Sequence, residues 1–469
     1  MGFRGRLSGA ERLLTFDDVF IVPGRAPVDP SGVDVSTRFS RNVRLLIPIS
    51  SSPMDTVTEY DMAVAMALAG GIGVIHRNMP REQQAEVASR VKQSPPVQTS
   101  RVYLPAEGDC SRAYDELRSL GLRDAPVVSR DGSVVGHVRA SSLRGCRGRP
   151  VSSVMEPPRA FDVRRAQEAL DVLEASGSDT VAVVIQGSQY LGTVTFDASL
   201  NRVTPALDGE GRLIVAAAVS PFDVDRARLL DRYVDAIVTD VAHFHNVEAM
   251  ASARSMAKEV RADFVVGNVG TYEAAVEAVT VVERVDGLRV GIAGGSICTT
   301  SSVGGAYAPT LWAVASVRDA VDEHGAVDMP IIADGGMRSS GDVVKALAAG
   351  ASSAMLGYLL AGTDEASAPT IRVGDVAYKP YRGMASRGAM ERRFAVDRYT
   401  RSSKRVQEGV EGLVEYKGPV LSVLSDLVEG VKAGLGYAGA SNIRELWGRA
   451  RFGIAPPKQT PGELFRTGP

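Results

Sequence analysis

The chain has 469 residues, of which 45% are hydrophobic and 23% charged, and its formal net charge at pH 7 is −2. This composition is ordinary for a soluble globular protein, and the small net charge argues against nucleic acid or an anionic membrane surface as a partner. At about 150 residues per domain the length suits two or three domains, although a single α/β barrel can take about 250.

The cysteines and the N-terminus bear on the cellular setting. Cys110, Cys146 and Cys298 are too few for a disulfide framework, and there is no Cys-x-x-Cys motif. This pattern fits a reducing, cytoplasmic location. The first residues lack the apolar core of a signal peptide, and no run of 18 apolar residues exists, so no membrane span is expected.

Short apolar segments alternate with amphipathic ones along most of the chain. Eight candidate strands cover residues 46–50, 71–75, 213–219, 236–240, 264–269, 288–292, 331–333 and 353–357. Helical patterns lie between most of them, for example at 59–68, 272–282 and 341–349. Apolar strands that alternate with helices indicate a parallel sheet, and eight such units predict an α/β fold of the (β/α)8 TIM-barrel type. A doubly wound sheet is the alternative, but no Gly-x-Gly-x-x-Gly follows the first strand.

An internal repeat interrupts this alternation. Residues 113–143 match residues 169–200 at an offset of 56 residues, and each copy has the pattern helix, strand, turn, strand. Two such copies predict a small α/β module inserted into the barrel. The predicted domains are residues 1–94 and 208–469 for the barrel, with a lid at 379–417, and residues 95–207 for the tandem module.

Because the loops after the strand C-termini build the sites of such barrels, the candidate site lies there. The sixth of these loops reads GIAGGSICTT and contains Ser296, Cys298 and Thr300. A cysteine among glycine N–H groups suits a nucleophile of lowered pKa, and glycines suit a phosphate. A buried apolar cysteine and a helix-capping threonine are the alternatives.

The last two strands end on further glycines. Asp334 precedes Gly335 and Gly336, and Gly357 ends the eighth strand. Phosphate sites recur at these two loops, and Asp334 suits the hydroxyls of a ribose, although the glycines are also compatible with simple tight turns. In the polar lid, Arg398, Tyr399 and Glu408 are candidates for proton transfer, and a solvated charged loop is the alternative.

Several long motifs resemble one known family. They are TFDDVFIVP (15–23), SSPMDTVTE (51–59), GSICTT (295–300), ADGG (333–336), YRGM (381–384) and DRY (397–399). Over nearly the whole chain they resemble the family of inosine-5′-monophosphate (IMP) dehydrogenase and GMP reductase, more closely the dehydrogenase. The inserted repeat is similar to the pair of CBS motifs in that family.

The resemblance implies an activity and an assembly. Cys298 would attack C2 of the purine of IMP, and hydride would pass to NAD, so that a thioimidate forms and water then releases XMP. GMP reductase, which converts GMP to IMP and ammonia with NADPH, is the second hypothesis, and a non-catalytic regulator that binds purine nucleotides is the third. A homotetramer is implied by resemblance alone.

The resemblance also implies residue roles. The catalytic residues would be Cys298, Thr300, Arg398, Tyr399 and Glu408. The nucleotide would contact Ser52, Met54, Gly295, Ser296, Asp334, Gly335, Gly336, Met355, Gly357, Tyr381, Gly383, Met384 and Glu408. The cofactor would lie near Asp240, Asn268 and Gly291, and potassium would bind backbone groups of Gly295 and Cys298. The chain has Tyr358, Ala293 and Ala385 where the family has serine, glycine and glycine.

Overall fold

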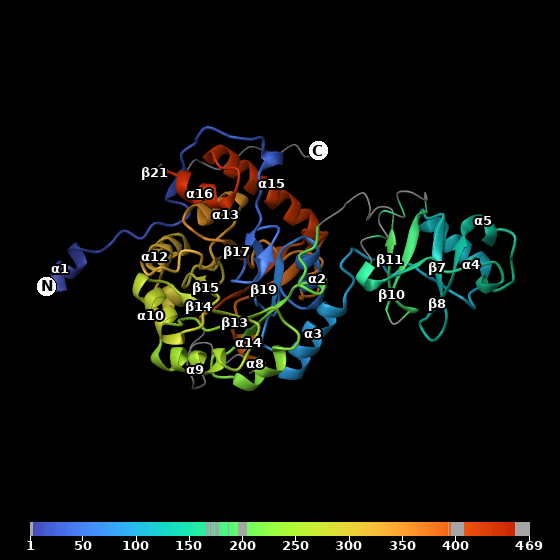
Figure 1. The fold of residues 1–469 in the computed structure, drawn as a ribbon, viewed down its shortest axis with the longest axis horizontal. Coiled ribbons are helices and arrows are strands. Elements are labelled where there is room, and N and C mark those ends of the chain that lie inside the picture. Colours follow the sequence, from blue (N-terminus) through green and yellow to red (C-terminus); the bar gives the residue numbers. More distant parts are fainter. Residues whose placement is uncertain are drawn as a thin grey trace. The chain divides into compact units, whose positions relative to one another are not determined.

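The computed structural model describes residues 3–165, 178–185, 187–195, 204–392 and 408–454, together with residues 168, 171, 173 and 394. The chain forms two compact units (Figure 1). The first unit contains Met1–Met66, Gly71–Ala88 and Val215–Pro469, and the second contains Ala67–Gly70 and Ser89–Ile214.

A closed barrel of eight parallel strands is the centre of the first unit, so the predicted TIM barrel is confirmed. Around the barrel the strands are β12 (Ala216–Val219), β13 (Ala236–Thr239), β14 (Asp263–Val269), β15 (Gly287–Val290), β16 (Ile331–Asp334), β17 (Ser353–Leu356), β4 (Ile49–Ser51) and β5 (Ile72–Ile75). Each of the eight predicted segments overlaps one of these strands.

Helices cover the outside of the barrel (Figure 1), which explains why its strands are buried on both faces. They are α2 (Tyr60–Leu68), α3 (Arg81–Gln93), α8 (Val224–Leu230), α9 (Val247–Ala257), α10 (Tyr272–Val282), α12 (Thr310–Glu323), α13 (Ser340–Ala348), α15 (Val420–Ala438) and α16 (Ile443–Arg449). Side chains of Asn246, Thr271 and Ser339 accept backbone N–H groups at the starts of α9, α10 and α13. No helix of the described residues is long and apolar enough to cross a membrane.

Both ends of the predicted lid, residues 379–417, form regular secondary structure. Its two ends belong to an antiparallel sheet of β18 (Ile371–Val373), β19 (Val376–Arg382) and β20 (Glu411–Glu415), and α14 (Arg387–Glu391) lies between them. The sequence pattern did not predict β19, because Lys379 places a charged side chain at a buried position of this strand. Its ammonium group donates to the carbonyl oxygens of Thr363, Asp364 and Ala366 at 2.7, 2.9 and 2.8 Å, and burial lowers its pKa.

The second unit contains two sheets of the same design. One sheet has β6 (Leu104–Pro105), β7 (Asp124–Val128) and β8 (Val134–Arg139), and the other has β9 (Ala160–Asp162), β10 (Thr180–Ile185) and β11 (Gln189–Thr195). In both, a parallel strand and an antiparallel strand flank the central one, and the hairpin register shifts at Val127/Val128 and at Val183/Val184. These shifts are separated by the same 56 residues as the sequence repeat.

One disulfide bond corrects the expectation from the cysteine count. It joins Cys110, the first residue of α4 (Cys110–Ser119), to Cys146, which follows α5 (Ala140–Leu143), and the two Cα atoms are 5.8 Å apart. Both cysteines lie in the apolar core of their sheet and helices. The sequence did not predict this disulfide bond, because the two cysteines are 36 residues apart and only tertiary packing brings their side chains together.

Replacing both Cys110 and Cys146 by alanine should destabilise the second unit. The chain-entropy estimate for a loop of this length is about 4 kcal/mol in the free energy of unfolding. Urea unfolding of the wild-type protein with and without reductant should show the same loss, whereas the double variant should not respond to reductant. Identical wild-type curves in both conditions would contradict a structural role for the bond.

Asp208 near the end of the second unit makes this unit sensitive to acid. Burial opposes its ionisation, but the hydrogen bonds of Lys92 and Arg212 outweigh burial and lower the pKa of Asp208 to about 2. Because this pKa is depressed, the stabilisation is present at neutral pH and is lost as the pH falls from about 4 toward about 2. Asp208→Asn should therefore lower the free energy of unfolding by about 2 kcal/mol at pH 7, and the difference from the wild type should shrink in acid.

Candidate active site

A pocket of about 500 Å³ opens where the carboxyl ends of the barrel strands meet their loops. It is lined by nearly all described residues that the sequence assigned to the site, namely Ser52, Met54, Asn268, Gly291, Gly295, Ser296, Cys298, Thr300, Asp334, Gly335, Gly336, Met355, Gly357, Tyr381, Gly383, Met384 and Glu408. Asp240 is not on the wall of the pocket, and Arg398 and Tyr399 lie outside the described residues.

The loop that follows β15 is shaped by close backbone contacts. A Cβ atom on Gly291 would lie 2.4 Å from the carbonyl oxygen of Asp334, and the φ angle of Gly291 is 128°, so only glycine fits there. Ala293 has a φ angle of 61°, a left-handed conformation in which a glycine would be unstrained. The chain thus retains the turn with an alanine at this position.

Backbone hydrogen bonds hold the segment of Glu408 against the cysteine loop. Cys298 and Gly409 form an antiparallel bridge, the N–H of Thr299 donates to the carbonyl of Glu408 at 3.1 Å, and the N–H of Val410 donates to the carbonyl of Ile297 at 3.0 Å. Two segments more than 100 residues apart in the sequence are therefore joined directly at the nucleophile.

A chain of hydrogen bonds runs from the thiol to a carboxylate. The thiol of Cys298 donates to Oγ1 of Thr300 at 3.3 Å, and the Thr300 hydroxyl donates to Oε2 of Glu408 at 2.9 Å. Glu408 is only 6% exposed. Thr300 begins α11 (Thr300–Gly304), and its side chain contacts the acid, so the helix-capping alternative is not what the structure shows. This arrangement can carry a proton from the thiol to the carboxylate.

Two glycine turns pack closely against each other in the wall of the pocket. Gly335 and Gly336 have φ angles of 89° and 82°, and a Cβ on Gly335 would lie 2.9 Å from the backbone nitrogen of Gly295. Such turns bring backbone N–H groups close to one another, which is the arrangement that binds phosphate. Asp334 precedes them with a side chain that is 14% exposed.

Two tyrosines line the same end of the pocket. Burial raises the pKa of Tyr381 far above its ordinary value, so its phenol stays protonated, with Oη 3.8 Å from the sulfur of Met54. The Tyr358 ring centroid lies 6.1 Å from that of Tyr381, and Nζ of Lys417 lies 4.9 Å from the Tyr358 centroid. Tyr358 remains 41% exposed, so it presents an aromatic ring where the family has a serine.

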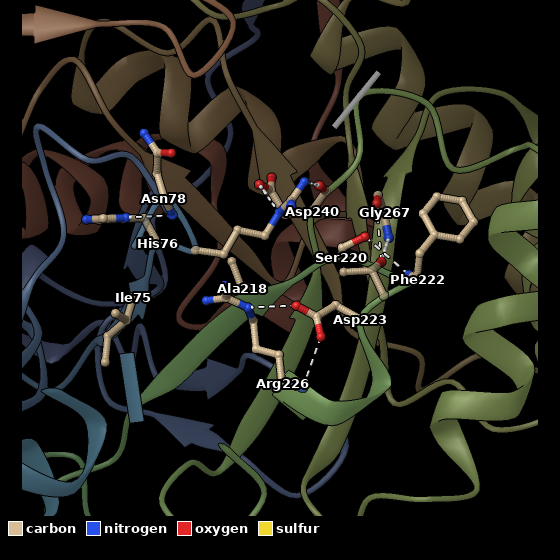
Figure 2. Close-up of polar contacts among 12 residues, drawn as sticks. Ile75, His76, Asn78, Ala218, Ser220, Phe222, Asp223, Arg226, Asp240 and Gly267 are labelled. Carbon is tan, nitrogen blue, oxygen red and sulfur yellow. Dashed lines mark hydrogen bonds and ion pairs between the residues drawn. The ribbon is translucent and has the colours of Figure 1, made fainter. Parts of the chain in front are cut away.

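Asp240 is buried among charged side chains and does not line the pocket. Its Oδ1 accepts from Arg289 at 2.9 Å, and its Oδ2 and backbone oxygen accept from Arg77 at 3.3 and 2.9 Å. Figure 2 shows Asp240 with its polar contacts. Sequence reasoning missed both arginines. Arg289 interrupts the apolar strand LRV, and a charge inside a barrel strand was the signal available.

A second missed pair joins two recognised motifs. Arg382 of the YRGM motif donates to both carboxylate oxygens of Asp55 of the SSPMDT motif, at 3.1 and 2.6 Å, and Asn78 donates to the same group at 2.8 Å. Burial alone would raise the pKa of Asp55, but the hydrogen bonds and charge of Arg382 outweigh it and keep that pKa below its ordinary value. The Asp55–Arg382 pair therefore holds β19, including Tyr381, against the loop that follows β4.

The predicted potassium site consists only of backbone groups, those of Gly295 and Cys298. The carbonyl of Gly295 already accepts the N–H of Cys298 at 3.0 Å. Within the described ranges, no cluster of three or more histidine, cysteine, aspartate or glutamate side chains could hold a metal ion. Potassium at Gly295 and Cys298 stays a prediction, and no step proposed below depends on it.

Comparison with known proteins agrees with this geometry. Residues 13–457 match the model of the IMP dehydrogenase / GMP reductase domain. Inosine-5′-monophosphate dehydrogenases of Korarchaeum cryptofilum and Thermoplasma acidophilum are 42% and 40% identical to the chain, over 96% of it and over 95% and 93% of their own lengths.

Solved structures give a similar result. A variant GMP reductase from Trypanosoma brucei in complex with guanosine 5′-monophosphate has a TM-score of 0.72 and 34% identity, and covers 96% of this chain and 97% of its own. The same enzyme in a second structure has a TM-score of 0.75 and 32% identity, over 96% of this chain and 98% of its own. The resemblance found in the motifs is confirmed, and the chain belongs to the IMP dehydrogenase / GMP reductase family of oxidoreductases.

Proposed function

We propose that the protein oxidises IMP to XMP with NAD, through a covalent intermediate on Cys298. The observation that carries this proposal is the hydrogen-bonded chain from Cys298 through Thr300 to Glu408 in the wall of the pocket. The full-length similarity to IMP dehydrogenases supports the choice of nucleotide and of reaction direction.

The thiol is activated by its neighbours. Glu408 takes the proton of Thr300 while Thr300 takes that of Cys298, so the sulfur becomes a thiolate as it adds to C2 of the purine. The hydrogen on C2 then leaves with its electron pair, and a thioimidate links C2 to the sulfur. NAD, when bound, supplies the acceptor for that hydride.

The nucleotide is held at the opposite wall. Asp334 accepts hydrogen bonds from the ribose hydroxyls, and backbone N–H groups of the glycine turns at 335–336 and 357 bind the phosphate. The GMP reductase of Trypanosoma brucei binds a purine monophosphate of the same size class, which supports a nucleotide in this pocket.

Water completes the reaction. It adds to C2 of the thioimidate, the C2–sulfur bond breaks, and Cys298 is released as XMP forms. We assign water activation to Arg398 and Tyr399 on the basis of the DRY motif, although both residues lie outside the described structure. Thr300 and Glu408 are the alternative proton acceptors in this step.

One orphaned atom supports a dinucleotide beside the nucleotide. Asn268 lines the pocket, and its Oδ1 atom is buried and has no hydrogen-bond partner among the described residues. A buried acceptor of this kind is costly unless a donor satisfies it, and a hydroxyl or amide of NAD is such a donor. Gly291, next to it, accepts the amide N–H of Asn268 at 2.9 Å.

GMP reduction is the second candidate, and the similarity to the Trypanosoma brucei structures favours it. The same thiolate would displace ammonia from C2 of GMP, and Thr300 with Glu408 would protonate the leaving group. NADPH would then deliver hydride to C2, and the C2–sulfur bond would break, which releases IMP and the Cys298 thiolate. A regulator without turnover is the third candidate and would bind IMP without reaction.

We also propose that the second unit is a pair of CBS motifs and that the protein is a homotetramer. The equal strand orders of its two sheets at an offset of 56 residues support the former, and only the family resemblance supports the latter. Light scattering of the purified protein tests the assembly.

One comparison of initial rates separates the candidate activities. We expect NADH formation with IMP and NAD, and little NADPH oxidation with GMP. NADPH oxidation that requires GMP, without IMP oxidation, would establish the reductase instead. Tight IMP binding without turnover in either assay would favour the regulator.

A further inference from the structure

Four charged residues of alternating sign, three of them buried, form a chain of ion pairs that leads into the pocket. Arg77 contacts Asp240, Asp240 contacts Arg289, and Arg289 contacts Asp334. Their side chains are 2%, 1%, 2% and 14% exposed. They follow or belong to β5, β13, β15 and β16, and the chain of ion pairs is electrically neutral.

Only one end of this chain of ion pairs reaches the pocket. Arg289 and Asp334 line the pocket, whereas Arg77 and Asp240 do not. Oδ2 of Asp334 accepts from Nε and Nη2 of Arg289 at 2.9 and 2.8 Å and from Asn268 at 2.8 Å. Three donors therefore converge on Oδ2 and restrict the orientation of the carboxylate, so that Oδ1 is the oxygen available to a nucleotide in the pocket.

We propose that Arg289 is a positioning residue whose guanidinium is shared between Asp240 and Asp334, and that Arg77 thereby controls the affinity of the pocket for the nucleotide without touching it. This inference rests on the proposed binding of a purine nucleotide at Asp334, but not on the direction of the reaction. It gives Asp240 a positioning role in addition to the cofactor contact that the resemblance implied.

The electrostatics of the interior support this role. At low effective dielectric constant a guanidinium responds strongly to each nearby carboxylate. Arg77 neutralises much of the charge of Asp240, which leaves Arg289 able to hold Asp334 with two of its nitrogen atoms. Without Arg77, Asp240 attracts Arg289 more strongly, and the carboxylate of Asp334 loses its fixed orientation.

This account predicts non-additive effects on IMP binding, measured by calorimetry without cofactor. Arg77→Met should weaken IMP binding about tenfold, because Asp240 without the charge of Arg77 competes more strongly with Asp334 for Arg289. Adding Asp240→Asn to Arg77→Met removes that competing charge, so the double variant should bind IMP within about threefold of the wild type. Arg77→Lys keeps the positive charge and should therefore retain most of the wild-type affinity for IMP.

Asp223→Asn is the matched control. It breaks the neighbouring Asp223–Arg226 ion pair, which Figure 2 shows and which is not part of the chain to Asp334. It should cost stability while leaving IMP affinity unchanged. Arg77→Gln gives the same comparison if Arg77→Met does not fold.

Steady-state kinetics add a second readout. The proposal predicts that Arg77→Met raises KM for IMP more than KM for NAD. Wild-type affinity in Arg77→Met, or a double variant that binds IMP as weakly as the single variant, would overturn the inference. A rise confined to KM for NAD in the double variant would also overturn the inference and would leave Asp240 with the cofactor contact alone. A wild-type protein that binds IMP but does not oxidise it would refute the proposed function alone, and one that does not bind IMP would refute both.

Discussion

Cys298→Ala is expected to abolish IMP oxidation while leaving the nucleotide bound. The sulfur forms the bond to C2, and no other described side chain of the pocket offers a thiol, so NADH formation should fall at least about 10⁴-fold. IMP binding should change by no more than about threefold, since Asp334 and the glycine turns supply the affinity. Initial rates and calorimetry on the same preparation measure the two effects.

Ser302→Ala is the matched control for this variant. Ser302 is exposed in the helix that follows the cysteine loop, so its variant should retain wild-type rates. Cys298→Ala with more than a tenth of wild-type activity would contradict covalent catalysis at this position.

Glu408→Gln is expected to give the second largest effect. Glutamine preserves the size of the side chain but cannot take the proton that Thr300 passes on, so kcat should fall about 10²–10³-fold with KM for IMP little changed. A stopped-flow burst of NADH isolates the oxidation half of the reaction.

Glu415→Gln tests the specificity of that effect. Glu415 is an exposed acid on β20, in the same segment of chain, and its loss should leave the burst unchanged. A Glu408→Gln burst within twofold of the wild type would show that the hydrogen-bonded chain does not activate the thiol.

The barrel and the place of its site were predictable from local sequence. The alternation of apolar strands with amphipathic helices predicted the eight strand–helix units of the barrel, since strand and helix periodicities are both local properties of a sequence. The residues after the strand ends then had to meet on one face, which brought Cys298, Asp334 and Gly357 to one pocket. The polar lid segment added Glu408, whose contact with Thr300 spans 108 residues.

Buried charges and the disulfide were beyond that reasoning. Arg289 and Lys379 occupy positions where pattern analysis expects apolar side chains, and each is stabilised by partners that only the folded chain supplies. Asp240 was assigned by resemblance to the cofactor, but its environment depends on Arg77, which lies 163 residues away in the sequence. Long-range pairing of this kind leaves no periodic trace in one sequence.

The most direct measurement of the central claim is the mass of Cys298 after acid quenching. Protein mixed with IMP and NAD and quenched within a turnover should yield a Cys298 peptide that carries the purine nucleotide minus one hydride, and Cys298→Ala should yield none. The same adduct from GMP alone would indicate the reductase while preserving the role of the cysteine. Rapid NADH formation with Cys298 unmodified at every quench time would contradict the account.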